Sequence, residues 1–164
     1  MFILTDKNTL ANTYIAELRD VEIQKDPLRF RRNIERLGEI MAYEISKELD
    51  YSTKNIKTPL GIKKQNTIDN QPILCTVLRA GLPFHQGFLS YFDRAQSSFL
   101  GAWREEGNGE IEIKLNYLAS PSLKDRELII VDPMLATGGS LVKAIEAIKS
   151  HGEPKRIFIV AIIA

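Results

Sequence analysis

The sequence has 164 residues, of which 44% are hydrophobic and 26% are charged, as in an ordinary globular domain with a buried core. Its 22 basic and 21 acidic residues leave a formal charge of +1, so charge gives no reason to expect nucleic-acid or membrane binding. The single cysteine excludes an intramolecular disulfide, and no secretory signal or apolar stretch of ~20 residues is recognisable, so we expect a cytoplasmic protein.

Two helices are predicted in the first fifty residues. A short helix over residues 9–19 precedes a longer one that begins at Asp26-Pro27, because an acidic residue followed by proline is a frequent helix start. The longer helix ends near Leu49, and its apolar residues recur at three- and four-residue spacing to form one face: Phe30, Ile34, Leu37, Met41, Ile45 and Leu49. Residues 51–72 are polar and contain two prolines and a glycine, which favours a hairpin or arm outside the core.

Short apolar runs alternate with helical patterns in the rest of the chain. Buried strands are predicted at residues 73–78, 128–131 and 157–163, a further strand at 97–103, and helices at 83–91 and 141–150. A turn at 107–109 and the alternating residues 111–117 predict a hairpin with one wet face. The whole pattern predicts one α/β domain over residues 1–164, with a mostly parallel sheet flanked by helices and a protruding β hairpin or arm.

The most informative stretch is D-P-M-L-A-T-G-G-S at residues 132–140, between a buried strand and a helix. Ligands in open α/β sheets bind beyond the carboxyl ends of the strands, where this loop should lie. Gly138 and Gly139 allow a tight turn, and the amides at the helix start form an anion site with hydroxyls from Thr137 and Ser140 nearby. That arrangement suits a phosphate monoester.

Asp132 has a different task in this interpretation. A carboxylate repels phosphate but accepts hydrogen bonds from a vicinal diol, so Asp132 suits the 2′ and 3′ hydroxyls of a ribose. A plain strand-to-helix turn, in which the two glycines serve geometry alone, is the structural alternative. Neither the G-x-x-x-x-G-K-S/T loop nor the G-x-G-x-x-G fingerprint is present.

The same nine residues resemble the ribose-phosphate loop of uracil phosphoribosyltransferases, which are type I phosphoribosyltransferases. Pro133 favours the uracil branch, because most other members of the class have a second acidic residue at that place. Residues 78–82 (L-R-A-G-L) resemble the pyrophosphate loop of the family, whose peptide bond can be cis. Residues 29–31 and 41–44 resemble its N-terminal helix.

This resemblance implies the transfer of ribose 5-phosphate from phosphoribosyl pyrophosphate to N1 of uracil, which gives UMP and pyrophosphate and uses Mg²⁺. Arg79, Arg104 and Asp132 would be the catalytic residues, with both arginines on the pyrophosphate and no side chain assigned as a metal ligand. The hairpin at 104–120 resembles a mobile loop that covers the site. The implied substrate-binding residues are Arg79, Arg104, Asp132, Pro133, Met134, Leu135, Ala136, Thr137, Gly138, Gly139 and Ser140.

Simpler interpretations of single residues remain open at this stage. Arg79 could form a surface ion pair, and Arg104 could be an exposed arginine at the end of a strand. Cys75 lies in an apolar run and is expected to be a buried small residue rather than a nucleophile. His85 and His151 carry no supporting motif and are expected at the surface or at helix ends, so no general base is apparent.

The sequence departs from the family at its C-terminal side. The family selects uracil with a glycine-rich segment of the type Y-I-V-P-G-L-G-D-A-G-D, and no such segment follows residues 157–163. We therefore expect residues 1–164 to be an incomplete version of a longer protein.

The alternatives for function are a nucleotide-sensing regulator that binds RNA, a phosphoribosyltransferase for another base, and a generic phosphate-binding domain. The family also implies a homodimer or larger homo-oligomer, for which the arm at 51–72 is a plausible interface.

Overall fold

The computed structural model describes the backbone of residues 1–107 and 110–164 and the side chains of residues 1–101 and 117–164. The predicted turn at 107–109 therefore lies partly outside the described residues. Three short 3₁₀ turns accompany the main elements, which are listed in chain order: α1 Leu10–Arg19, α2 Pro27–Ser46, β1 Tyr51–Thr58, β2 Gly61–Ile68, β3 Ile73–Leu78, α3 Leu82–Tyr91, β4 Gln96–Gly107, β5 Glu110–Ala119, β6 Glu127–Val131, α4 Gly139–Ile148 and β7 Arg156–Val160.

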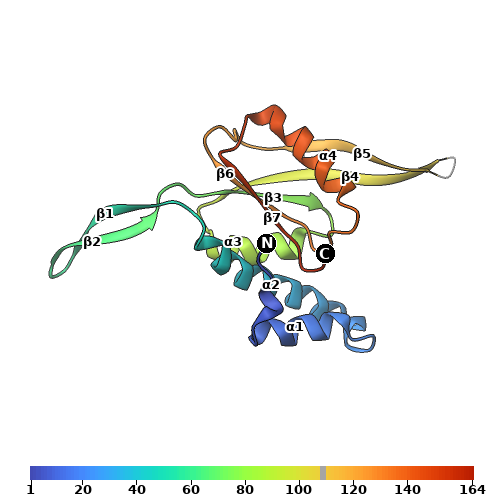
Figure 1. Cartoon of the computed structure of the whole chain (residues 1–164), viewed down its shortest axis with the longest axis horizontal. Coiled ribbons are helices and arrows are strands. Elements are labelled where there is room, and N and C mark those ends of the chain that lie inside the picture. Colours follow the sequence, from blue (N-terminus) through green and yellow to red (C-terminus); the bar gives the residue numbers. More distant parts are fainter. Residues whose placement is uncertain (108–109) are drawn as a thin grey trace.

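A five-stranded sheet in the order β5-β4-β3-β6-β7 forms the centre of the molecule (Figure 1). β3 pairs in parallel with both β4 and β6, and β6 pairs in parallel with β7. Only the β4–β5 hairpin is antiparallel among these described strands. The predicted α/β fold with a mostly parallel sheet is therefore confirmed.

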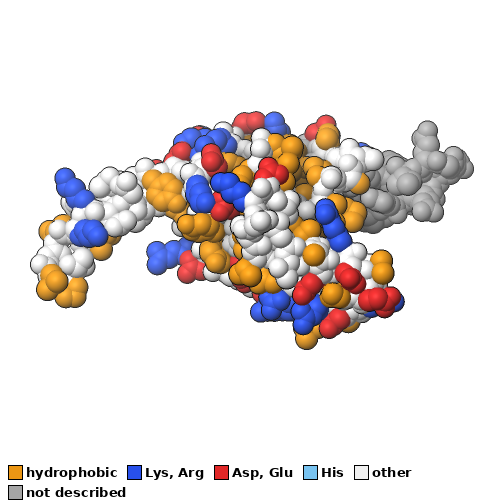
Figure 2. Space-filling model, turned by 60° about the horizontal axis from the view of Figure 1, so that its bottom comes forward, with side chains coloured by type: hydrophobic (Ala, Val, Ile, Leu, Met, Phe, Trp, Pro, Cys, Tyr) orange, Lys and Arg blue, Asp and Glu red, His pale blue; other side chains and the backbone are white. Residues whose placement is uncertain are grey.

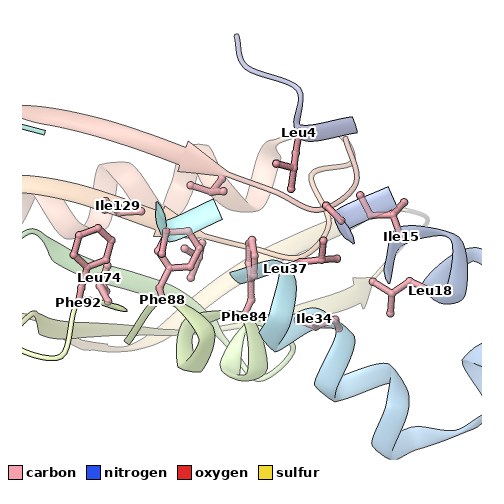
Figure 3. Packing of buried hydrophobic residues seen from close by; sticks show 14 of the residues in the cluster. Leu4, Ile15, Leu18, Ile34, Leu37, Leu74, Phe84, Phe88, Phe92 and Ile129 are labelled. Carbon is pink, nitrogen blue, oxygen red and sulfur yellow. The ribbon is translucent and has the colours of Figure 1, made fainter. Parts of the chain in front are cut away.

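Helices cover both faces of the sheet, with α4 on one side and α2 and α3 on the other (Figure 1). Side chains alternate along each central strand, because successive residues of a strand point to opposite faces. Leu74 and Ile129 join the core on the α2 and α3 side, part of which Figure 3 shows, together with Phe84 and Phe88. The next residues along β3 and β6 join the second core, under α4.

Helices α2 and α3 approach each other closely because glycine stands where they cross. A β-carbon built on Gly87 would lie 2.1 Å from the carbonyl oxygen of Glu35, and one on Gly38 would lie 2.6 Å from the carbonyl oxygen of Phe84. The start of α2 is as the sequence predicts, since Asp26 accepts hydrogen bonds from the amides of Leu28 and Arg29.

The two-stranded sheet β1–β2 is the predicted arm, and it projects from one end of the body (Figure 1). Its free end is apolar and exposed, as the orange side chains at the far left of Figure 2 show, with Leu60 100% and Ile62 75% exposed. At its base Asp50 forms ion pairs with Lys155 and Arg156, which tie the arm to the start of β7.

Two expectations from the sequence are wrong. The predicted buried strand at 157–163 ends at Val160, and only this residue of β7 is buried, while Ile159 is 50% exposed. The reason is its place in the described sheet, where β7 is an edge strand with a partner on one side only.

His85, expected near the surface, is 3% exposed on the inner side of α3, with its ring 5.2 Å from that of Phe99. His151 lies in a short 3₁₀ turn after α4, as expected of a helix-end residue.

None of the helices in the described part of the chain combines the length and the apolar character needed to span a bilayer.

Candidate active site

The strand order reverses at β3, and the candidate site lies at this reversal. β3 has β4, the next sheet strand in sequence, on one side and β6, a much later strand, on the other. In an open α/β sheet such a reversal leaves a crevice at the carboxyl ends of the strands, because the connections depart in opposite directions. The loops after β3 and after β6 leave paired parallel strands, so they lie side by side at this edge, where the topology favours a ligand crevice.

The loop after β3 carries Arg79 and folds back over the end of its strand. The peptide bond between Leu78 and Arg79 is cis. The amide of Gly81 donates to the carbonyl of Val77 at 3.3 Å, and the amide of Leu82 donates to the carbonyl of Arg79 at 3.2 Å. The Arg79 side chain is exposed, and no ion pair within the described residues engages it, so its guanidinium is available to an anionic ligand.

The loop after β6 is held in place by the main chain that follows β7. The amide of Leu135 donates to the carbonyl of Ile163 at 2.8 Å, and the amide of Ile163 donates to the carbonyl of Pro133 at 3.2 Å. The amide of Asp132 donates to the carbonyl of Val160 at 3.0 Å. These bonds fix the path of the loop from Asp132 to Leu135.

The predicted anion site falls where the loop after β6 runs into α4. Gly138 is the N-cap residue with φ +76°, a left-handed conformation that glycine adopts without steric cost. The amide of Val142 donates to the carbonyl of Gly138 at 2.9 Å and closes the first turn. The preceding amides have no intrahelical acceptors, and the exposed Thr137 and half-buried Ser140 lie beside them. This end of the helix is suited to a phosphate group.

Asp132 stands between the sheet and this loop. Its partial burial raises the pKa of the carboxyl group above the ordinary value, and a hydrogen bond from the amide of Met134, at 3.4 Å, opposes that effect. A carboxylate that has lost water without gaining strong partners is stabilised by new donors. Two sugar hydroxyls are donors of the right kind.

The other site residues predicted from the sequence fall into two groups. The loop residues all lie within the described part of the chain. Met134 and Ala136 are exposed, and Pro133, Leu135 and Gly139 are half-buried. Arg104 belongs to β4, but its side chain lies outside the described residues, so its part in the site stays a prediction.

Clusters of metal ligands and the single cysteine are two further candidates for chemistry in the described part of the chain. Within the described residues there is no cluster of three or more His, Cys, Asp and Glu that would hold a metal ion. Cys75 is fully buried, and burial raises the pKa of its thiol to about 12, as expected of a structural residue.

Two features of the site are not among those predicted from the sequence. The support of the loop by residues 160–163 depends on pairing between distant segments, for which no local sequence signal exists. Thr76 is fully buried beneath the crevice, and its hydroxyl donates to the carbonyl of Val131 at 3.0 Å. A threonine in an otherwise apolar buried run was the available signal.

Comparison with known proteins decides the family. The family model for uracil phosphoribosyltransferase matches residues 4–164. A uracil phosphoribosyltransferase of Porphyromonas gingivalis is 48% identical over 159 residues, which cover 96% of this chain and 74% of the relative. The chain belongs to the uracil phosphoribosyltransferase family. Another uracil phosphoribosyltransferase, from Methanothermobacter thermautotrophicus, is 36% identical over 85% of this chain and 65% of its own length.

Solved structures agree with the fold. A protein of Aquifex aeolicus superimposes with a TM-score of 0.81 at 27% identity, covering 96% of this chain and 84% of that one. A purine phosphoribosyltransferase of Pyrococcus horikoshii gives a TM-score of 0.57 at 19% identity, covering 78% of this chain and 71% of that one. The second likeness concerns the fold alone. The family's type I fold, predicted from the loop sequence, is thus present in this chain.

Proposed function

We propose that this chain transfers ribose 5-phosphate from phosphoribosyl pyrophosphate to N1 of uracil, with UMP and pyrophosphate as products, in pyrimidine salvage. The observation that carries the proposal is that two loops leave the paired parallel strands β3 and β6 at the same edge of the sheet. The loop after β3 offers an exposed arginine, and the loop after β6 offers a carboxylate at its start and a helix N-terminus at its end. A sugar that carries phosphate at one end and pyrophosphate at the other matches this distribution of charge.

Each part of the ligand then has a partner. The amides and hydroxyls of residues 136–140 bind the 5-phosphate, and Asp132 accepts hydrogen bonds from the 2′ and 3′ hydroxyls. Arg79 binds the pyrophosphate, and Arg104 is proposed to join it from the β4–β5 hairpin. Contacts to the uracil ring are not assigned to any residue.

The chemistry follows from the charges. The bond between C1 and the pyrophosphate oxygen breaks, the ribose gains oxocarbenium character, and uracil N1 forms the new bond to C1. The N1 proton passes to the departing pyrophosphate, which becomes basic as it leaves. Arg79 and Arg104 stabilise the negative charge that grows on the leaving pyrophosphate, which is the largest contribution expected from the protein. Closure of the hairpin at 104–120 would exclude water, which otherwise hydrolyses the activated sugar.

Mg²⁺ fits this site as an ion brought in with the substrate. Mg²⁺ is commonly bound through one or two carboxylates together with substrate phosphates and waters. Asp132 is the carboxylate beside the crevice, and Pro133 next to it supplies no second one. When bound, the ion would neutralise part of the pyrophosphate charge.

The remaining parts of the proposal concern context. Residues 1–164 would act as one phosphoribosyltransferase domain in the cytoplasm, with no nucleic acid or membrane as partner. A homodimer or larger homo-oligomer is proposed, and the exposed apolar tip of the arm, Leu60 and Ile62, supports the arm as an interface.

The test is a set of parallel reactions with phosphoribosyl pyrophosphate, Mg²⁺ and one labelled base each: uracil, orotate, hypoxanthine or guanine. The proposal predicts UMP from uracil and no nucleotide from the other bases. If a nucleotide forms from a different base, that base is the substrate in place of uracil, and the reaction class stays the same. Tight binding of phosphoribosyl pyrophosphate without any nucleotide, together with a salt-dependent RNA shift, would favour the regulator instead.

A further inference from the structure

The floor of the crevice is where the two substrate loops meet. The ladder between β3 and β6 has its last rung at Thr76 and Val131. Beyond it β3 continues two residues further beside β4, whereas β6 turns into Asp132. The separation between the two loops is therefore set at this rung.

Thr76 makes two contacts there, a hydrogen bond and a close packing contact. Its hydroxyl, fully buried, donates to the carbonyl of Val131 at 3.0 Å, directly before Asp132. Gly81, in the loop after β3, packs on the same hydroxyl so closely that an added β-carbon would lie 1.9 Å from it. One oxygen atom thus contacts the strand that leads to the ribose loop and the loop that carries Arg79.

We propose that Thr76 is a positioning residue that fixes the distance between the pyrophosphate loop and the ribose-phosphate loop. This inference rests on the proposed function, since it assumes that one ligand spans both loops. Thr76 does not touch the substrate. It acts through Val131 and Gly81, and its effect appears only when both loops hold the same molecule.

The physical reason is that valine has nearly the shape of threonine but replaces the hydroxyl with a methyl group. A methyl group and a carbonyl oxygen stay farther apart than the hydrogen-bonded 3.0 Å, so the last rung must widen by a few tenths of an ångström. Each loop can keep its own structure after that shift. A ligand that bridges both loops then loses part of one set of contacts.

The experiment compares three ligands on the parent protein and on Thr76→Val: phosphoribosyl pyrophosphate, ribose 5-phosphate and inorganic pyrophosphate, each titrated with Mg²⁺ in a calorimeter. We expect Thr76→Val to weaken the binding of phosphoribosyl pyrophosphate about tenfold. The affinities for ribose 5-phosphate and for pyrophosphate should change less than about twofold. Thr76→Ser, which keeps the hydroxyl, restores the parental affinity.

The matched control is Ser98→Ala, which removes another buried hydroxyl bond of the same sheet, to the carbonyl of Ala119 at 3.2 Å. Ser98→Ala should lower the unfolding temperature about as much as Thr76→Val does. It should leave the affinities for all three ligands unchanged.

Equal weakening of all three ligands by Thr76→Val would mean general loosening and would overturn the inference, as would parental affinity for phosphoribosyl pyrophosphate. A parent protein that binds neither this compound nor its halves would refute the proposed function itself, which is a distinguishable result.

Discussion

Replacement of Gly81 by alanine is expected to damage the site far more than its small size suggests. The new methyl group would lie 1.9 Å from the Thr76 hydroxyl and 3.0 Å from the Val77 carbonyl, where ordinary contacts begin at 3.4 Å. Thr76 cannot yield easily, because it is buried and hydrogen-bonded to Val131. The loop that carries Arg79 must therefore move by more than 1 Å.

The size of the effect follows from that displacement. Overpacking of this kind costs about 1–3 kcal/mol, which lowers the unfolding temperature of a domain of this size by roughly 2–12 °C. A displacement of about 1 Å in a substrate-binding loop can reduce function about 100-fold, so we expect phosphoribosyl pyrophosphate binding to fall roughly 10- to 100-fold. Calorimetric titration of the ligand and thermal unfolding of the free protein measure the two effects separately.

Gly87→Ala is the matched control. Its methyl group would lie 2.1 Å from the Glu35 carbonyl, at the crossing of α2 and α3. We expect a comparable loss of stability with unchanged ligand affinity. The reasoning is refuted if Gly81→Ala binds like the parent, or if Gly87→Ala weakens binding as strongly as Gly81→Ala does.

Three further outcomes follow from single residues. Burial lowers the pKa of His85, so the folded protein resists protonation of this side chain, whereas the unfolded chain accepts a proton below about pH 6.5. The free energy of unfolding should therefore fall as the pH drops below that value, by up to about 1.4 kcal/mol per pH unit. Urea unfolding at pH 5 to 8 tests this, and a His85→Leu variant with the same slope as the parent would contradict it. Ile163→Pro removes one of the two amides that donate to the Pro133 carbonyl, so it should weaken the binding of ribose 5-phosphate several-fold and leave the binding of pyrophosphate unchanged. Equal loss of both affinities would show that residues 160–163 do not act on the loop after β6 alone. Cys75 should react with a thiol reagent at neutral pH only as fast as the protein unfolds, since its thiol is buried and its pKa is about 12; rapid labelling of the native protein would disprove its burial.

Much of the fold is predictable because its signals are local. Asp26 marks the start of α2 because its carboxylate accepts hydrogen bonds from amides only two and three residues ahead, and Pro27 stands at the first helical position. The apolar runs at β3 and β6 are buried because helices cover both faces of the sheet. The loop at residues 132–140 stands out in the sequence for the same reason, since its acidic residue and its two glycines fall within nine residues.

The errors concern features decided by distant parts of the chain. The length and exposure of β7 depend on its place at the edge of the sheet, which its own apolar sequence does not encode. His85 was misplaced because a histidine is usually read as polar. It stands next to Phe84 and three residues before Phe88, so helical spacing alone puts it on the inner face of α3.

The most direct test of the account is calorimetric titration of phosphoribosyl pyrophosphate, with Mg²⁺, into the parent protein, Asp132→Asn and Arg79→Ala. The account predicts that the parent binds this compound more tightly than ribose 5-phosphate or pyrophosphate. It also predicts that each substitution weakens it about 10- to 100-fold, as expected for the loss of a charge-assisted contact. A parent that binds ribose 5-phosphate as tightly as phosphoribosyl pyrophosphate, or variants that bind like the parent, would contradict the assignment of the two loops to the two halves of one substrate.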